Sequence, residues 1–221
     1  KNIWSVSEFM SNYNGSKDAD TYVWQPKLPT WGTAPYQWDA SSGVLTVGAG
    51  DLQDGGLAPY KNGSIQLTDV KEIVFTAPVI APPGISKGTG LFQGLRNMTA
   101  ITGLVNLDTS KVTDMGYMFD GDKSLTSLDL SHFNTSNVTS MWSMFNGASS
   151  LTSVDISTFD SSNVQYTTYM FSNTTKLQSL KIGQRFKFLA TDAGLGDPPS
   201  NEQYTGKWQN LGSGTKDFPM G

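Results

Sequence analysis

Three segments of this 221-residue chain are near copies of one another, and their spacing restricts the possible folds more than any other feature. The copies begin at Met118, Met144 and Met170, so successive copies start 26 residues apart. Each contains an L-x-x-L-x-L pattern or a close variant, such as the one that begins at Leu125. A constant period in the twenties with this core is typical of a solenoid, in which each repeat forms one coil stacked on the next. Such stacks usually present a surface to a partner, and few of them enclose a catalytic pocket.

Each repeat divides into a strand and a segment that follows it. Apolar and polar residues alternate in the L-x-L core, which predicts a strand with one buried face. After a turn rich in Asn, Asp and Ser, residues Val138, Met141, Met144 and Phe145 follow at helical spacing. We therefore predict an α/β solenoid: a leucine-rich-repeat stack of about five coils, with a parallel β-sheet on one face and short helices on the other.

A single coil of this kind buries too little apolar surface to offset its conformational entropy, so the stack needs caps at its ends. The stretch 38–47 predicts a β-hairpin with a glycine in its turn. The last repeat has Arg185 where the earlier coils have Phe133 and Phe159. We expect three parts: an N-terminal cap with the β-hairpin (1–64), the leucine-rich-repeat solenoid (65–183), and a C-terminal cap and linker (184–221).

The composition excludes several classes of protein. Charged residues make up only 15% of the chain and the net charge is −4, so the basic stripe of a nucleic-acid binder is absent. The chain has no cysteine, which excludes disulfides and thiol nucleophiles and favours a bacterial origin. No apolar run approaches the roughly 20 residues that span a bilayer, so we expect no membrane insertion of this segment. No signal peptide opens the chain, and we expect a fragment of a larger secreted protein.

The repeat resembles that of the BspA-like leucine-rich-repeat surface proteins of bacteria. The resemblance rests on SLTSLDLSHFNTSNVTSMWSMF and NLDTSKVTDMGYMF, and it covers about 65–221. WDASSGVLTVGAG and KEIVFTAPV resemble the region before such repeats in lactic-acid-bacterial surface proteins. The resemblance implies an extracellular protein of a Gram-positive cell wall or surface, often proposed to mediate adhesion. It implies no catalytic chemistry.

Candidate catalytic residues are few. His132 is the only histidine, and we interpret it as a solvated turn residue, which excludes Ser-His-Asp chemistry. Asp129 and Asp155 occupy one column of adjacent strands, with Lys181 next in that column. Strands about 4.8 Å apart would place the two carboxylates near the 5–5.5 Å separation of a retaining glycosidase. The alternative is a solvent-facing column that was copied with the repeat. We favour that alternative and expect no enzyme.

Metal sites and cofactors are not expected. Asp120 and Asp122 form an acidic pair, as do Asp18 and Asp20, but neither pair continues into a calcium loop with a distal glutamate. We interpret both pairs as surface turns.

The best candidates for partner binding are aromatic. The predicted strand face carries mainly Ser and Asp and lacks the Trp, Tyr and Arg that dominate interfaces. On the predicted helices, Tyr117, Trp142 and Tyr169 fall in neighbouring columns. Our hypothesis is that these three residues form an exposed aromatic stripe that contacts a partner or glycan. The alternative is that they pack between adjacent helices or under loops.

A second group of aromatic residues lies in the predicted N-terminal cap. It could be a platform on which sugars stack, but we favour the core of the cap, because this region has few aliphatic residues. The members are Tyr22, Trp24, Trp31, Tyr36 and Trp38.

The sequence thus predicts a non-catalytic adhesion or protein-interaction module of a bacterial cell-surface protein. The expected partners are host or matrix glycoproteins such as mucin, or another surface protein, and the module itself is expected to be a monomer. The first alternative is a carbohydrate-binding module that uses the exposed aromatic residues. A polysaccharide hydrolase is the least favoured reading.

Overall fold

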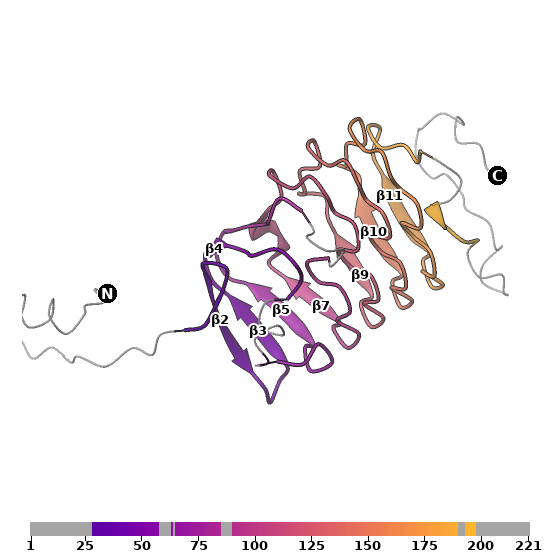
Figure 1. Cartoon of the computed structure of the whole chain (residues 1–221). Coiled ribbons are helices and arrows are strands. Elements are labelled where there is room, and N and C mark those ends of the chain that lie inside the picture. Colours follow the sequence, from indigo (N-terminus) through magenta and orange to yellow (C-terminus); the bar gives the residue numbers. More distant parts are fainter. Residues whose placement is uncertain (1–27, 58–62, 64, 85–89, 190–192, 198–221) are drawn as a thin grey trace, which may run out of the picture.

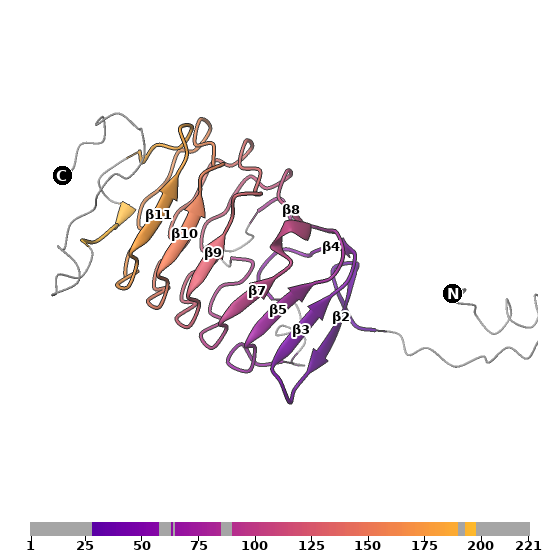
Figure 2. The same cartoon turned by 180° about the vertical axis from the view of Figure 1, so that it is seen from behind.

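The structure is a computed structural model that describes residues 28–57, 63, 65–84, 90–189 and 193–197. The described chain winds as a β-solenoid of about five coils, with parallel strands stacked side by side along its length (Figure 1). The view from behind shows the same order of strands, so the coils follow one another in space as they do in the sequence (Figure 2). The predicted solenoid is confirmed. Residues 1–27 of the predicted N-terminal cap and 198–221 of the predicted C-terminal cap and linker lie outside the described residues.

The predicted parallel strands are present on one side of the coils, which we call the strand side. They form two sheets with the orders β1-β2-β3-β5-β7 and β11-β10-β9. Their bounds are β1 Thr30–Trp31, β2 Ala34–Asp39, β3 Val44–Val47, β5 Glu72–Phe75, β7 Ala100–Thr102, β9 Ser127–Asp129, β10 Ser153–Ile156 and β11 Ser179–Ile182. The register pairs equivalent repeat positions, for example Val154 with Leu128 and with Leu180. The hairpin is also confirmed, since β2 pairs antiparallel with β3 around a turn in which Gly43 has a φ of 75°.

A second, short sheet joins the early coils after the strand side. It consists of β4 Gly50–Asp51, β6 Val79–Ile80 and β8 Leu107–Asp108, all parallel. In later coils, buried hydroxyl groups instead of strands join one coil to the next at this position. Thr135 Oγ1 donates to Asp160 O (3.1 Å) and accepts from Asp160 N (2.7 Å), and Thr109 bridges to Asn134 in the same way. A buried hydroxyl that both donates and accepts satisfies the backbone of the next coil without a strand.

The prediction of short helices on the opposite side is wrong. The described residues contain the short 3₁₀ helix η1 (Leu104–Asn106), a further 3₁₀ residue at Ala193, and no α-helix. The segments expected to be helical are successive tight turns, and their alternate N–H groups donate to the next coil. Met141 N donates to Tyr166 O and Ser143 N to Thr168 O, at 2.9 and 3.0 Å. These N–H groups therefore cannot make the i→i−4 bonds of an α-helix.

The apolar positions of those segments are nevertheless buried as expected, because tight turns also direct them inward. Four phenylalanines on successive coils form a continuous stack of rings. The centroid separations are 5.4, 5.6 and 5.0 Å in the order Phe92, Phe119, Phe145, Phe171. Offset-stacked rings at this separation attract one another beyond their burial, so the stack ties the coils together along the axis.

The last coil differs from the others at the position where the sequence has Arg185. The ring of Phe186, one residue later, is buried and meets Phe159 edge-on at 6.4 Å. Phe188 contacts both Phe186 and Phe171 with edge-on rings. Phe186 therefore fills the core position that Phe159 fills in the preceding coil, and the rings of Phe186 and Phe188 cover the end of the stack.

Candidate functional site

Four exposed or half-exposed aromatic side chains gather on the turn side, which is the part of each coil that was predicted to be helical. We call them the aromatic face: Tyr117, Trp142, Tyr166 and Tyr169. Trp142, Tyr166 and Tyr169 keep 44%, 55% and 53% of their surface exposed. Tyr117 is half-buried, and its ring lies 6.0 Å from that of Trp142 at a tilt of 36°. The three residues predicted for the aromatic stripe thus lie on three successive coils, and each is partly exposed to solvent.

The backbone of the turns places these side chains. Tyr117, Ser143 and Tyr169 occupy the same position in successive coils, and all three have left-handed φ values of 57°, 55° and 58°. The left-handed turn lets the N–H at this position reach the next coil, as when Tyr117 N donates to Trp142 O at 2.9 Å. The following residue in each coil (Met118, Met144 or Met170) is buried. The turn therefore combines an inter-coil hydrogen bond with the return of the chain to the core.

The left-handed conformation is costly for the residues that adopt it. An L-residue pays about 1–2 kcal/mol there, whereas glycine pays no such steric cost. Tyrosine at two of the three positions is therefore not explained by the turn itself. Steric strain retained beside an exposed ring is an observation from which a functional role can be inferred.

The sequence prediction missed one member of the aromatic face. Tyr166 follows Ser140 by 26 residues and pairs with it as an isolated parallel bridge, as Ser140 does with Asp114. Comparing residues column by column would have found it. Ser143, which occupies the position of Tyr117 and Tyr169 in the coil between them, is buried at 4% exposure. The aromatic face is therefore interrupted at the centre of this column.

The acidic column of the strand side is present as predicted. Asp129 pairs in register with Asp155, and Asp155 with Lys181, whose Nζ lies 2.8 Å from Asp155 Oδ2. Hydrogen bonds from Ser131 hold the pKa of Asp129 below its usual range. Partial burial acts to raise the pKa of Asp155, but hydrogen bonds from Lys181 and Ser157 outweigh it and lower that pKa. Both carboxylates are therefore ionised, whereas the general acid of a glycosidase needs a raised pKa. The exposed His132 lies near the start of this column.

One aspartate is buried without a full set of partners. Asp122, expected in a surface turn, is 0% exposed, and its Oδ1 accepts from Leu95 N at 2.8 Å. No hydrogen bond reaches its Oδ2 from the described residues. Burial raises the pKa of Asp122 well above the usual value. The neighbouring Asp120 instead joins a row of exposed or half-exposed amides, since it accepts from Gln93 and Asn146, both at 2.8 Å.

The described members of the N-terminal aromatic cluster belong to the core. Trp31 and Tyr36 are buried, and Trp38 packs partly buried against the same cluster. The rings of Trp31 and Tyr36 therefore offer no open face to a sugar. Tyr22 and Trp24 lie outside the described residues.

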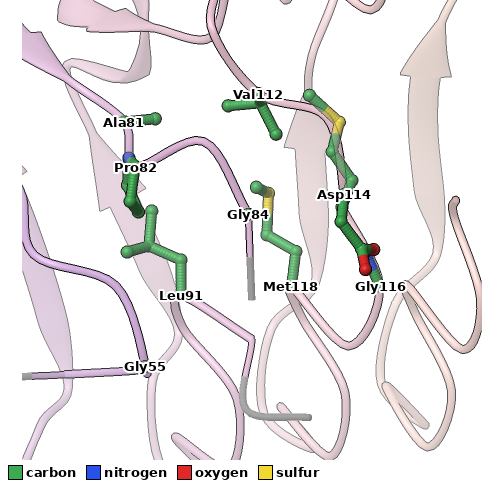
Figure 3. A pocket seen from close by; sticks show the side chains of 10 residues that line it. Gly55, Ala81, Pro82, Gly84, Leu91, Val112, Asp114, Gly116 and Met118 are labelled. Atoms are coloured by element: carbon green, nitrogen blue, oxygen red, sulfur yellow. The ribbon is translucent and has the colours of Figure 1, made fainter. Parts of the chain in front are cut away.

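A small apolar hollow lies on the turn side between the coil that contains β5 and the coil that contains β7. Figure 3 shows Leu91, Pro82, Val112 and Met118 around it, with the carboxylate of Asp114 at its rim. Its volume is about 10 Å³, which is room for about one water molecule. It is too small for an organic ligand.

Within residues 28–57, 63, 65–84, 90–189 and 193–197, no group of three or more His, Asp or Glu side chains could share a metal ion. The same described part of the chain contains no helix with the length and apolar character that crossing a bilayer requires.

The coils that carry this geometry resemble a known family. Residues 88–187 match the family model described as Mycoplasma protein of unknown function, DUF285. The DUF285-like segment spans the coils of the aromatic face and the phenylalanine stack, a little under half of the chain. No curated protein and no solved structure matched the chain.

Proposed function

We propose that this chain is a non-catalytic binding module of a bacterial cell-surface protein, and that it contacts its partner through the aromatic face. The observation that carries the proposal is the pair of tyrosines at left-handed turn positions, where glycine would avoid the strain. Tyrosine and tryptophan are the residues that most often anchor interfaces, since they bury a large area at a low entropic cost. The strand side offers few such anchors.

The expected partner is a host or matrix glycoprotein such as mucin, or another surface protein. Two similarities support a bacterial surface setting. The DUF285-like segment relates the coils to a family described from Mycoplasma. The resemblance to BspA-like surface proteins points to an extracellular, adhesive role.

A carbohydrate ligand is the second candidate. The rings of Tyr117 and Trp142 lie 6.0 Å apart on adjacent coils and together form an apolar platform with polar edges. Sugar rings present comparable apolar faces. Hydrolysis of a polysaccharide has less support, because the lowered pKa values of Asp129 and Asp155 leave the acidic column without a general acid.

A triple variant tests the proposal, with Tyr117→Gly, Trp142→Ser and Tyr169→Gly. Glycine removes each tyrosine ring and relieves the left-handed strain, so lost packing is partly offset and the fold is retained. Adhesion to mucin-coated and matrix-coated surfaces should fall at least tenfold. Glycan arrays run beside protein-ligand panels separate the two candidate partners.

Ser143→Gly is the matched control, because it makes the same backbone change at the same turn position without removing a ring. Its adhesion should equal that of the parent chain. Undiminished adhesion by the folded triple variant would refute the proposal.

A further inference from the structure

The parallel strands of the solenoid are not continuous along the strand side. β7 pairs with β5, and β9 pairs with β10, but within the described chain no ladder joins β7 to β9. All other neighbouring coils on this side are joined, from β3 to β7 and from β9 to β11. The break therefore divides the strand side into two sheets between the third and fourth coils (Figure 2).

The break has a structural cause in the third coil. After β7, the chain enters a left-handed turn at Gly103 and then the 3₁₀ helix η1. A side chain at Gly103 would lie 2.2 Å from Phe75 O, so this turn packs tightly on the preceding coil. No later coil has a helix after its strand within the described residues. β7 is thus packed against the preceding coil and does not pair with β9. The same two coils remain hydrogen-bonded to each other on the turn side, as from Tyr117 N to Trp142 O.

An open groove of about 280 Å³ occupies the break. Its floor is apolar, since it includes the half-buried Ile101 and the buried Leu104 and Leu128. Val105 stands at its rim with 74% of its surface exposed. The remaining lining residues are Gly103, Ser127, Asp129 and His132.

The two walls of the groove are strands of three residues each, β7 and β9. Each wall therefore has a strand edge that faces the break. Edges with unpaired N–H and C=O groups are templates for a further strand. A peptide that adds to them gains main-chain hydrogen bonds, and the pockets between them select its side chains.

The charge of the groove restricts which peptides can bind there. Asp129 lies in its wall and makes no salt bridge within the described chain, whereas Asp155 in the next coil is paired with Lys181. The same column therefore carries one carboxylate in a salt bridge and one, Asp129, whose described partner is the backbone N–H of Ser131 at 3.0 Å. An occupant with a basic side chain beside Asp129 would supply the charge that Lys181 supplies to Asp155.

We propose that the groove between β7 and β9 binds an extended peptide segment of a partner protein as an inserted strand, with an apolar side chain on Ile101 and Leu128 and a basic side chain at Asp129. This site is separate from the aromatic face and does not depend on it. Three or four residues of the peptide would pair with the walls, and the two sheets would then become one.

A random hexapeptide library selected on the 221-residue chain tests the inference. Enriched peptides should carry alternating β-branched residues and one Lys or Arg. Ser127→Trp, which places a large ring over the groove from an exposed position, should weaken a selected peptide at least tenfold. Ser179→Trp makes the same change at the equivalent exposed position of β11 and should have no effect.

Four further measurements define the mode of binding. N-methylation of alternate peptide amides should abolish binding, because it removes the donors of one edge. Asp129→Asn should weaken the selected peptide about two- to fivefold, as expected for an exposed ion pair. Asp155→Asn should leave the affinity of the selected peptide unchanged. The triple aromatic-face variant should bind the peptide normally, which separates this inference from the proposed function.

The inference is overturned if no selected peptide distinguishes the parent chain from Ser127→Trp. It is also overturned if the groove is occupied by a second copy of the chain, which would appear as a concentration-dependent dimer that Ser127→Trp abolishes. Binding that appears only after 1–27 or 198–221 is removed would assign the groove to the chain's own terminus instead.

Discussion

The phenylalanine stack leads to a quantitative prediction about the middle of the solenoid. Phe145 is fully buried, and its ring stacks on Phe119 at 5.6 Å and on Phe171 at 5.0 Å. Phe145→Leu loses volume and both ring contacts. Phe133 is similarly buried in the adjacent coil, but its ring meets only that of the exposed His132 among the described residues. Phe133→Leu is therefore a control that loses similar volume without a phenylalanine stack.

An aromatic pair contributes about 0.5–1.5 kcal/mol beyond its buried area. The two pairs of Phe145 therefore make Phe145→Leu more destabilising than Phe133→Leu by roughly 1–3 kcal/mol. Equilibrium denaturation in urea at pH 7 measures this difference as a shift in the transition midpoint at constant slope. Equal losses for the two variants would mean that burial alone accounts for the stack.

Further predictions concern a buried charge and a close backbone contact. Burial raises the pKa of Asp122 in the folded state. Asp122 therefore does not destabilise the folded state at pH values below the ordinary pKa of 3.8. As the pH rises from there toward the folded-state pKa, the destabilisation grows by about 1.4 kcal/mol per pH unit. Asp122→Asn keeps an acceptor for Leu95 N and should melt higher than the parent chain at pH 7 but not at pH 3.5; a pH-independent difference would contradict this. Gly183→Ala should destabilise by about 3 kcal/mol, because its Cβ would lie 1.7 Å from Ser157 O. Gly196→Ala, whose added Cβ would have no described atom within 4 Å, should be neutral in the same urea titration. Similar losses for both variants would refute the steric reason.

The strand side and the hairpin could be predicted because their signals are local and periodic. Alternation around Leu128 and Val154 fixes which side chains are buried, and the repeat fixes their register. The turn at Gly43 follows from the glycine itself, which accepts a positive φ.

The turn side could not be predicted from spacing, because burial of Val138, Met141 and Phe145 fits both a helix and a series of tight turns. What decides between them is the destination of the N–H groups of 141, 143 and 145, which donate to the next coil. That destination is a property of the stack and not of one repeat. The left-handed tyrosines were hidden for the same reason, since only the stacked backbone requires that conformation.

At the end of the stack, prediction from the repeat pattern failed at a single position. Arg185 breaks the strict period, but the core accepts Phe186 one residue later. A rigid alignment of columns does not allow for such a shift.

The bonds between coils connect positions one repeat apart, as in Thr152 N to Thr126 O and Gln178 N to Thr152 O. A duplicated or deleted repeat would therefore preserve the pattern of bonds between the remaining coils. The protein can accordingly be lengthened or shortened in increments of one strand spacing, about 4.8 Å. The backbone would then set the distance between successive tyrosine positions. A partner with a matching repeat would contact more of these positions in a longer stack.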